Sequence, residues 1–194
     1  MAVTGILALL VASPALSRLL VYPRTEFFTE LSLLDPNHRA ENYPYNITRG
    51  QNYSVFLEIA NHLGYTAYYL VEVKFRNMTQ SAPTSFGPHA NRTPSTLPSL
   101  YNITAFVADE GMWEKPLTFS LDYAYNDMLS QIEFGSLRFN DVVLNVTGYR
   151  TAWDPVGKGF FGYLFFELWL YNATSSSFQY HERFVALRLN MTLT

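Results

Sequence analysis

Residues 2–22 are the only segment of this chain apolar enough to enter a membrane, and they constrain the remainder more than any other feature. The segment reads AVTGILALLVASPALSRLLVY and carries a single charge, Arg18. As a helix, rising about 1.5 Å per residue, it would cover about 30 Å, the thickness of a bilayer's hydrocarbon core. We therefore expect a hydrophobic helix over residues 1–23 and a separate domain over residues 24–194, exported or held at a membrane surface.

This segment has three interpretations: it is cleaved off, it stays in the membrane, or it packs into a filament. A cleaved signal peptide would carry basic residues before its apolar stretch, and the sequence has none before Val3. A retained membrane anchor tolerates Pro14 as a kink, and Arg18 can extend to the interface. Alternatively, the segment packs into neighbouring subunits of a filament. We favour the anchor, although Arg18 and Arg24 then lie on the outer side, against the usual excess of positive charge inside.

The composition of the chain indicates an extracellular, β-rich domain. Charged residues make up 15% of the chain and the net charge is −3, so there is no basic surface for nucleic acid. Aromatic residues make up 16%, which suits pleated, half-buried surfaces. The sequence contains no Cys, which excludes disulfides, thiolate metal sites and cysteine nucleophiles. We expect one domain that is held together by its core alone.

Asn-x-Ser/Thr sequons are the strongest compositional signal, because they use eight of the thirteen Asn residues. Asparagine and threonine also populate turns, but this number of sequons is typical of exposed N-glycosylation acceptors in a secreted chain. Few charges and many sequons predict a surface kept soluble by sugar, as in an archaeal cell-surface protein. The expected acceptors are Asn46, Asn52, Asn77, Asn91, Asn102, Asn145, Asn172 and Asn190.

Alternating apolar and polar side chains predict β-strands throughout the domain. The alternation is clearest in residues 53–60 and 65–75, and we expect these two runs to form a hairpin through a turn at residues 61–64. Seven to nine short strands separated by turn signals predict a mainly β fold, an immunoglobulin-like antiparallel β-sandwich. The other expected strands lie at residues 25–34, 100–109, 117–123, 134–147, which is one strand or two joined at Asn140-Asp141, 160–171 and 179–193.

Residues 160–171 are apolar on both faces except at Glu167, which is typical of a central strand covered on both sides. The apolar neighbours of Glu167 predict partial burial, which would raise the pKa of its carboxyl group. A raised pKa suits a general acid. We instead expect Glu167 to face solvent or to pair with an arginine of the adjacent strand, Arg183 or Arg188.

Two loop features are candidates for interaction. Residues 78–99 contain four Pro and one Gly with no periodicity, and an unstructured insertion of this length is usually functional or disordered. Trp113 and Trp153 are expected in loops beside Pro, where a Trp either covers the end of a sandwich or anchors a partner. For Trp113 we favour the covering role, and for Trp153 both roles stay open.

No motif points to catalysis or to a cofactor. The sequence lacks a nucleophile elbow, a phosphate loop and a dinucleotide fingerprint. Asp109, Glu110 and Asp154 could supply oxygen ligands to Ca²⁺, but no dense series of acidic residues supports such a site. We expect no catalytic, cofactor or metal site. The His residues are isolated from one another, so a metal site would need ligands from distant loops: His38, His62, His89 and His181.

Several segments match a pattern known from a protein family: TEFF at 25–28, LDPN at 34–37, AENYPYNITRG at 40–50, SVFLEIANH at 54–62, WEKPLTF at 113–119 and LFFELWLY at 164–171. On these residues the chain resembles the extracytoplasmic domain of an archaeal membrane-protein family catalogued as a domain of unknown function, number sixteen-sixteen. The resemblance covers about residues 25–192, and AENYP is its most specific part. It implies a fold and a location outside the membrane, and it implies no activity.

The sequence therefore predicts a non-catalytic, glycosylated archaeal cell-surface protein that makes protein–protein contacts. It would be anchored through residues 2–22 as an accessory subunit of a membrane assembly or as an envelope subunit. The expected partners are other protein subunits, the membrane and N-linked glycans, with no nucleic acid. The alternative is a structural subunit of an extracellular filament, assembled through the same segment as a pilin-like helix or as a donated strand. An enzyme is a third hypothesis.

Overall fold

The computed structural model describes residues 26–193, so the helix expected over residues 1–23 lies outside the described residues. Within the described part, no helix is long and apolar enough to cross a membrane. The prediction of a mainly β fold is confirmed, with one short 3-10 helix, η1, at His89–Asn91. The strands are β1 (Phe28–Leu34), β2 (Asn46–Ile47), β3 (Tyr53–His62), β4 (Ala67–Asn77), β5 (Tyr101–Val107), β6 (Gly111–Asn126), β7 (Gln131–Phe139), β8 (Val142–Asn145), β9 (Arg150–Asp154), β10 (Gly159–Asn172) and β11 (Ser177–Met191).

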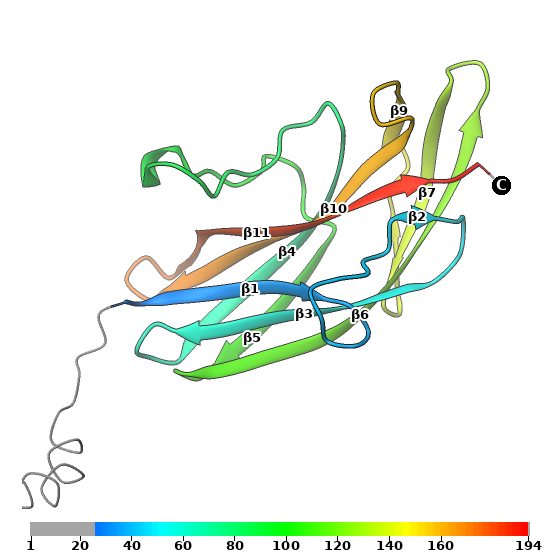
Figure 1. The fold of residues 1–194 in the computed structure, drawn as a ribbon. Helices are drawn as coiled ribbons and strands as arrows, with labels where there is room; N and C mark the ends of the chain where they lie inside the picture. The colour runs from blue at the N-terminus through cyan, green and yellow to red at the C-terminus, as the bar shows by residue number, and fades with distance from the viewer. Residues whose placement is uncertain (1–25, 194) are drawn as a thin grey trace, which may run out of the picture.

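The strands form one curled sheet with two halves that face each other (Figure 1). One half has the order β1-β3-β6-β7, with β8 also paired to β7. The other half has the order β5-β4-β10-β11-β2, and β9 connects the halves because it pairs with both β7 and β10. Strand pairs are antiparallel, except that β11 and β2 run parallel.

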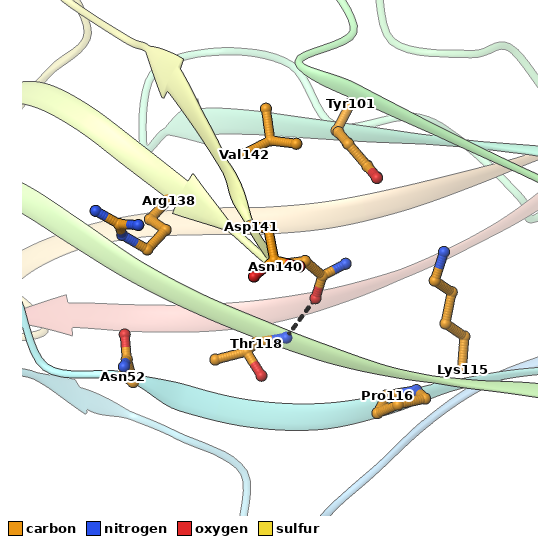
Figure 2. Close-up of a pocket in the computed structure, with 9 residues that line it drawn as sticks. All are labelled: Asn52, Tyr101, Lys115, Pro116, Thr118, Arg138, Asn140, Asp141 and Val142. Atoms are coloured by element: carbon orange, nitrogen blue, oxygen red, sulfur yellow. Dashed lines mark hydrogen bonds between the residues drawn. The ribbon is translucent and has the colours of Figure 1, made fainter.

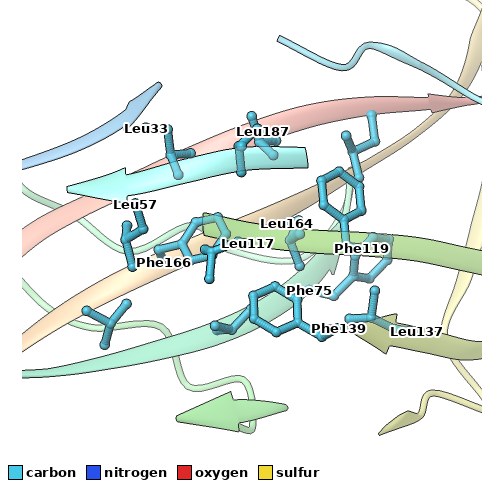
Figure 3. Packing of buried hydrophobic residues seen from close by; sticks show 14 of the residues in the cluster. Leu33, Leu57, Phe75, Leu117, Phe119, Leu137, Phe139, Leu164, Phe166 and Leu187 are labelled. Atoms are coloured by element: carbon cyan, nitrogen blue, oxygen red, sulfur yellow. The ribbon is translucent and has the colours of Figure 1, made fainter. Parts of the chain in front are cut away.

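The core fills the space between the two halves (Figure 3). Leu57 of β3 and Leu117 of β6 contribute from one half, while Val73 of β4 and Phe166 of β10 contribute from the other, and all four are 0% exposed. The alternation in residues 53–60 is confirmed, because every second side chain of β3 from Val55 onward is buried. A period of two therefore identifies the core face of these strands.

The structure has eleven strands in its described part, more than the seven to nine predicted. Residues 134–147 divide at Asn140-Asp141 into β7 and β8, one of the two predicted arrangements. The additional strands are β2 and β9, which lie outside the ranges expected as strands because Pro and Gly interrupt both segments. Two to five residues still pair with a neighbouring strand, as Asn46 and Ile47 do with Asn190 and Met191.

The predicted hairpin between residues 53–60 and 65–75 is wrong. β3 pairs with β1 and β6, whereas β4 pairs with β5 and β10, so the chain crosses from one half to the other at residues 63–66. Both strands bury their apolar faces in the same core from opposite sides, which their alternation alone could not distinguish from pairing. Asn61 holds this crossing, because its Nδ2 donates to the carbonyl oxygens of Tyr65 at 2.8 Å and Val107 at 2.9 Å.

The loop position predicted for Trp113, beside Pro116, is also wrong, because β6 begins at Gly111 and includes Trp113. Pro116 had indicated a loop, since proline cannot donate a hydrogen bond to a neighbouring strand. In the described structure, however, β6 pairs with β3 over residues 111–119 and with β7 only from Phe119 onward. Pro116 therefore lies where β6 is an edge strand, a position that tolerates proline.

Candidate functional site

The eight sequons separate into two groups by the position of the amide nitrogen, the atom that would carry a sugar. In the first group the Asn side chains are exposed, and no hydrogen bond within the described residues uses their Nδ2. Asn145 is an example, because only its Oδ1 is engaged, accepting from the Thr147 backbone N–H and hydroxyl at 2.9 and 2.6 Å. This accessible group consists of Asn46, Asn52, Asn91, Asn102 and Asn145.

In the second group the sequon is half-buried and its Nδ2 is a donor within the fold. Asn77 donates to the carbonyl oxygen of Arg150 at 2.9 Å, and Asn172 donates to Oε1 of Gln179 at 3.1 Å. Asn190 donates to Oδ1 of Asn46 at 2.9 Å. A sugar on any of these nitrogens would replace one of its two hydrogens and crowd the contact that the nitrogen already makes. We therefore expect modification at the five accessible sequons and little at these three.

The two tryptophans predicted as interaction residues are not brought together. Trp113 lies near the start of the long strand β6, whereas Trp153 lies on another strand, toward the opposite end of β6. Trp113 is half-buried on β6, pairs with Ile59 in register and packs against the core, so its predicted loop position is wrong. Trp153 is 49% exposed on β9 and packs edge-to-face on Phe160 at 5.2 Å between ring centroids. Trp153 is therefore the tryptophan of this pair that is available to a partner.

Trp153 belongs to a larger exposed apolar surface, which we call the distal tip. It is built from the β6–β7 and β9–β10 turns, which lie close together because Gln131 pairs with Ala152. Tyr125 links the two turns through an edge-to-face contact with Phe160 at 5.6 Å. Large exposed apolar side chains gathered at one end of a domain are typical of a contact site. The exposed members of the distal tip are Tyr125, Met128, Leu129, Trp153 and Val156.

Glu167 forms a buried ion pair that sequence analysis did not identify. It is 0% exposed, and Lys74 Nζ of the neighbouring strand β4 donates to its Oε2 at 2.7 Å. Arg183 and Arg188 are not its partners, because Arg183 Nε donates to the carbonyl oxygen of Thr29 and the Arg188 guanidinium group lies over the ring of Phe161. The favoured prediction, that Glu167 faces solvent or pairs with one of these arginines, is therefore wrong, and its burial exceeds the partial burial that its apolar neighbours indicated. Burial raises the pKa of the Glu167 carboxyl group, and hydrogen bonds from Lys74 and from the backbone of Ser95 oppose that rise.

This ion pair fastens the 78–99 loop onto the outer face of β4, β10 and β11. The Ser95 backbone N–H donates to Glu167 Oε1 at 2.6 Å, and its carbonyl oxygen accepts from Lys74 Nζ at 3.1 Å. Figure 1 shows the loop, in green, above β10 and β11. The loop therefore supplies the second cover that the apolar strand β10 requires, and it is an ordered part of the fold.

A second set of contacts holds the same loop through residues 84–92. Glu182 Oε2 lies 2.7 Å from both Nδ1 of His89 and a guanidinium nitrogen of Arg92. These hydrogen bonds, that of His89 first, hold the pKa of the Glu182 carboxyl group below its usual range. The Tyr180 hydroxyl donates to the Thr84 carbonyl oxygen at 3.2 Å. Sequence analysis missed these contacts because the paired residues are far apart in the chain.

His181 lies beside this loop and should make the domain less stable in acid. Its Nε2 lies 2.9 Å from the Thr29 hydroxyl, and burial, with Arg183 nearby, lowers its pKa from 6.5 to about 4. Between these values the unfolded chain binds a proton that the native state does not, so stability falls as pH drops from 6.5 to 4. For a half-buried ring we expect a loss of about 1–2 kcal/mol.

Denaturant unfolding at pH 7 and pH 4.5 of the native sequence and of His181→Gln measures this loss. The Gln variant cannot bind the proton, so its stability should change less over the same interval. Other groups also titrate here, Glu182 among them, and the difference between the two proteins cancels their contribution. Equal pH dependence of the two proteins would contradict the assignment to His181.

A surface depression of about 700 Å³ lies where β6 is an edge strand (Figure 2). Lys115 and Arg138 place two cations around it, Asp141 places one carboxylate, and Asn140 Oδ1 accepts from the Thr118 N–H at 2.9 Å. None of the residues that line it is buried. Exposed charges bind weakly because water screens them, so the depression lacks the features of a built ligand site.

Among the described residues, no three His, Asp or Glu side chains are arranged so that they could hold a metal ion. The imidazoles of His38 and His62 each lie 2.8 Å from one carboxylate, that of Glu114 and that of Glu110. The Ca²⁺ ligands considered above are dispersed, because Asp154 lies on β9 while Asp109 and Glu110 lie in the β5–β6 turn.

The sequence pattern of one protein family matches the chain. It is described as a domain of unknown function (DUF1616), and it matches residues 23–135. This range includes the AENYP segment and excludes residues 164–171, whose similarity was also suggested by the sequence. No curated protein matches the chain.

Solved structures resemble the chain only weakly. A beta-glucosidase from Listeria innocua in complex with glucose has a TM-score of 0.40 at 12% identity, over 88% of this chain and 17% of the enzyme chain. The ASH / PapD-like domain 7 of human CEP192 has a TM-score of 0.30 at 10% identity, over 89% of this chain and 91% of that domain. The chain thus spans about a sixth of the length of the beta-glucosidase, 17%. Scores this low carry no argument about function.

Proposed function

Because this chain belongs to the DUF1616 family, a family of domains of unknown function, we propose a function from its own surface. We propose that it is a non-catalytic, glycosylated archaeal cell-surface protein that makes protein–protein contacts. It is anchored in the membrane through residues 2–22, as an accessory subunit of a membrane assembly or as an envelope subunit.

The observation that carries this proposal is the distribution of sequons. Five of them are exposed and keep the amide nitrogen free of hydrogen bonds within the described fold. They lie on separate elements, on β2, before β3, in η1, on β5 and on β8. Sugars at these positions would cover much of the lateral surface, and charged residues make up only 15% of the chain. Glycans rather than charge would then keep the domain soluble.

The distal tip is the proposed surface for protein contacts. No sequon lies in either of its turns, residues 127–130 and 155–158, so sugar would leave it uncovered. Met128 is 92% exposed and Val156 is 91% exposed, while Trp153 supplies a large ring of the kind that dominates binding energy at interfaces. A partner subunit that covers these side chains would gain the hydrophobic free energy of their burial.

We also propose that the curled sheet is an immunoglobulin-like sandwich. The support is that two largely antiparallel halves enclose one core built from alternating residues of both. In an experimentally determined structure we expect the halves to pack face to face at about 30°, as aligned sandwiches do. A barrel closed through β9 with evenly tilted strands would contradict this description.

We predict that the native protein carries several glycans. Intact-mass measurement should show several sugar increments, and one should be lost in each of Asn102→Gln and Asn145→Gln. As matched controls, Asn77→Gln and Asn190→Gln should leave the number of increments unchanged, because the amide nitrogens of these residues are engaged in the fold. A native mass equal to that of the polypeptide would refute the surface-glycoprotein proposal.

Cell fractionation tests the location and separates the proposal from its alternative. A membrane-anchored protein should be recovered in the detergent-soluble membrane fraction. A subunit of an extracellular filament, the alternative use of residues 2–22, should be recovered in fibres sheared from the cell surface. Recovery with the cytoplasmic proteins would contradict both.

A further inference from the structure

One end of the domain, which we call the proximal end, is built from four segments. They are the start of β1 and the β3–β4, β5–β6 and β10–β11 turns, which Figure 1 shows on the left. Phe28 pairs in register with His62, which brings the start of β1 to the β3–β4 turn. Asn61 Nδ2 connects that turn to the β5–β6 turn through the carbonyl oxygens of Val107 and Ala108, at 2.9 and 3.2 Å.

Large apolar side chains surround the proximal end. Phe106 is 70% exposed on β5 and stacks on Tyr68 of β4 at 4.1 Å between ring centroids, with 9° between the planes. Tyr68 in turn contacts Tyr171 at 5.9 Å, so the rings form a fixed aromatic surface. Single exposed apolar residues are common, but a group around one end of a domain is not. The proximal rim consists of Phe27, Phe28, Tyr65, Phe106, Met112 and Tyr171, all exposed.

The proximal rim lies where the described chain begins. Residues 23–26 separate the apolar segment 2–22 from Phe27, and an extended chain covers at most about 3.6 Å per residue. Phe27 is therefore held within about 18 Å of Tyr22. If residues 2–22 enter a bilayer, the proximal end and not the distal tip lies next to its surface.

We propose that the proximal rim rests in the headgroup region of the membrane that residues 2–22 enter. This inference depends on the anchoring that we proposed above. Aromatic rings are favoured at this depth because they offer an apolar body to the acyl chains and, in Tyr, a hydroxyl to the headgroups. The short tether makes the contact intramolecular, so even weak individual contacts become populated.

The charged side chains and the sequon at the proximal end decide which kind of membrane surface it can approach. Glu30, Asp109 and Glu110 surround it, and His62 lies 3.8 Å from Glu30 and 2.8 Å from Glu110. Arg92 and Arg183 line the same depression as Phe27 and Phe28, so this end carries charges of both signs. The proposal is therefore restricted to zwitterionic headgroups, which also carry both. Asn172, the sequon at the end of β10, donates its amide nitrogen to Gln179, so a bulky sugar is not expected at this position next to Tyr171 of the rim.

Spin labelling of the full chain tests the proposal, and the absence of Cys allows a single label at any position. Phe106→Cys and Met112→Cys place a nitroxide on the proximal rim, and Met128→Cys is the matched control on the distal tip. All three positions are exposed, so the fold should be retained. Each full-length variant is reconstituted into phosphatidylcholine vesicles, and nitroxide relaxation by oxygen, which concentrates in lipid, is compared with relaxation by a water-soluble nickel chelate.

We expect the labels at residues 106 and 112 to respond more to oxygen and the label at residue 128 to respond more to the nickel chelate. Rim labels as accessible to the chelate as the distal label would overturn the proposal, and so would a distal label in lipid. Flotation of the same vesicles tests the anchor separately. Protein that floats with its rim in water contradicts only the rim contact, whereas protein that does not float contradicts the anchor and the rim contact together.

Discussion

Replacing Glu167 by alanine is expected to lower the free energy of unfolding by about 3–5 kcal/mol, although the residue has no assigned activity. The substitution leaves the Lys74 ammonium group, only 4% exposed, without the carboxylate that lies 2.7 Å from it. Glu72, at 2.9 Å, compensates only in part because it is closer to solvent. The backbone N–H of Ser95 also loses its acceptor, and an unsatisfied buried donor adds to the cost.

Denaturant unfolding of a small set of variants measures this effect. Glu182→Ala is the matched control, because it removes a carboxylate that binds the same loop from a more exposed position, and it should cost about 1 kcal/mol or less. The double variant Lys74→Met/Glu167→Leu should recover most of the loss because it removes the unpaired charge, and it should keep only the cost of the Ser95 N–H that has lost its acceptor. A loss below about 1 kcal/mol for Glu167→Ala would mean that the pair is open to water.

The fold class was predictable from the sequence because it depends on local alternation. Residues 53–60 and 160–171 form β3 and β10, and the second is covered on both faces as expected. The pairing of strands was not predictable in the same way. Residues 53–60 and 65–75 have compatible patterns, but which strand lies beside which is decided by contacts between distant segments. Loop markers such as Pro116 also misled the prediction, because an edge position tolerates proline.

The candidate sites were also predictable only in part, because local sequence identifies a residue type while its partners lie far away in the chain. Sequons can be read from three consecutive residues, but their accessibility depends on distant partners, as Asn77 depends on Arg150 and Asn172 on Gln179. Burial of Glu167 followed from its apolar neighbours, whereas its partner Lys74 is 93 residues away in the chain. A buried carboxylate requires such a partner, so the expectation of burial could have started a search for a lysine on an adjacent strand.

Leu168→Ala, one residue along β10 from Glu167, is expected to cost about 2–5 kcal/mol by a different mechanism. Successive side chains of a strand point to opposite faces, so Leu168 enters the core between the halves while Glu167 points to the 78–99 loop. Leu168 is 0% exposed and pairs in register with Val71, so the lost methyl groups leave a cavity that the central strand cannot close. The loop contacts should persist in this variant.

Thermal and denaturant unfolding of Leu168→Ala, with Leu129→Ala as the control, measures this cost. Leu129 is 55% exposed at the distal tip, so its truncation should change stability by no more than about 0.5 kcal/mol. Limited proteolysis adds a second readout: the 78–99 loop should be cleaved faster in Glu167→Ala than in Leu168→Ala when the two are compared at equal fractions unfolded. An effect of Leu168→Ala as small as that of Leu129→Ala would mean that β10 faces the other way, with Glu167 toward the core.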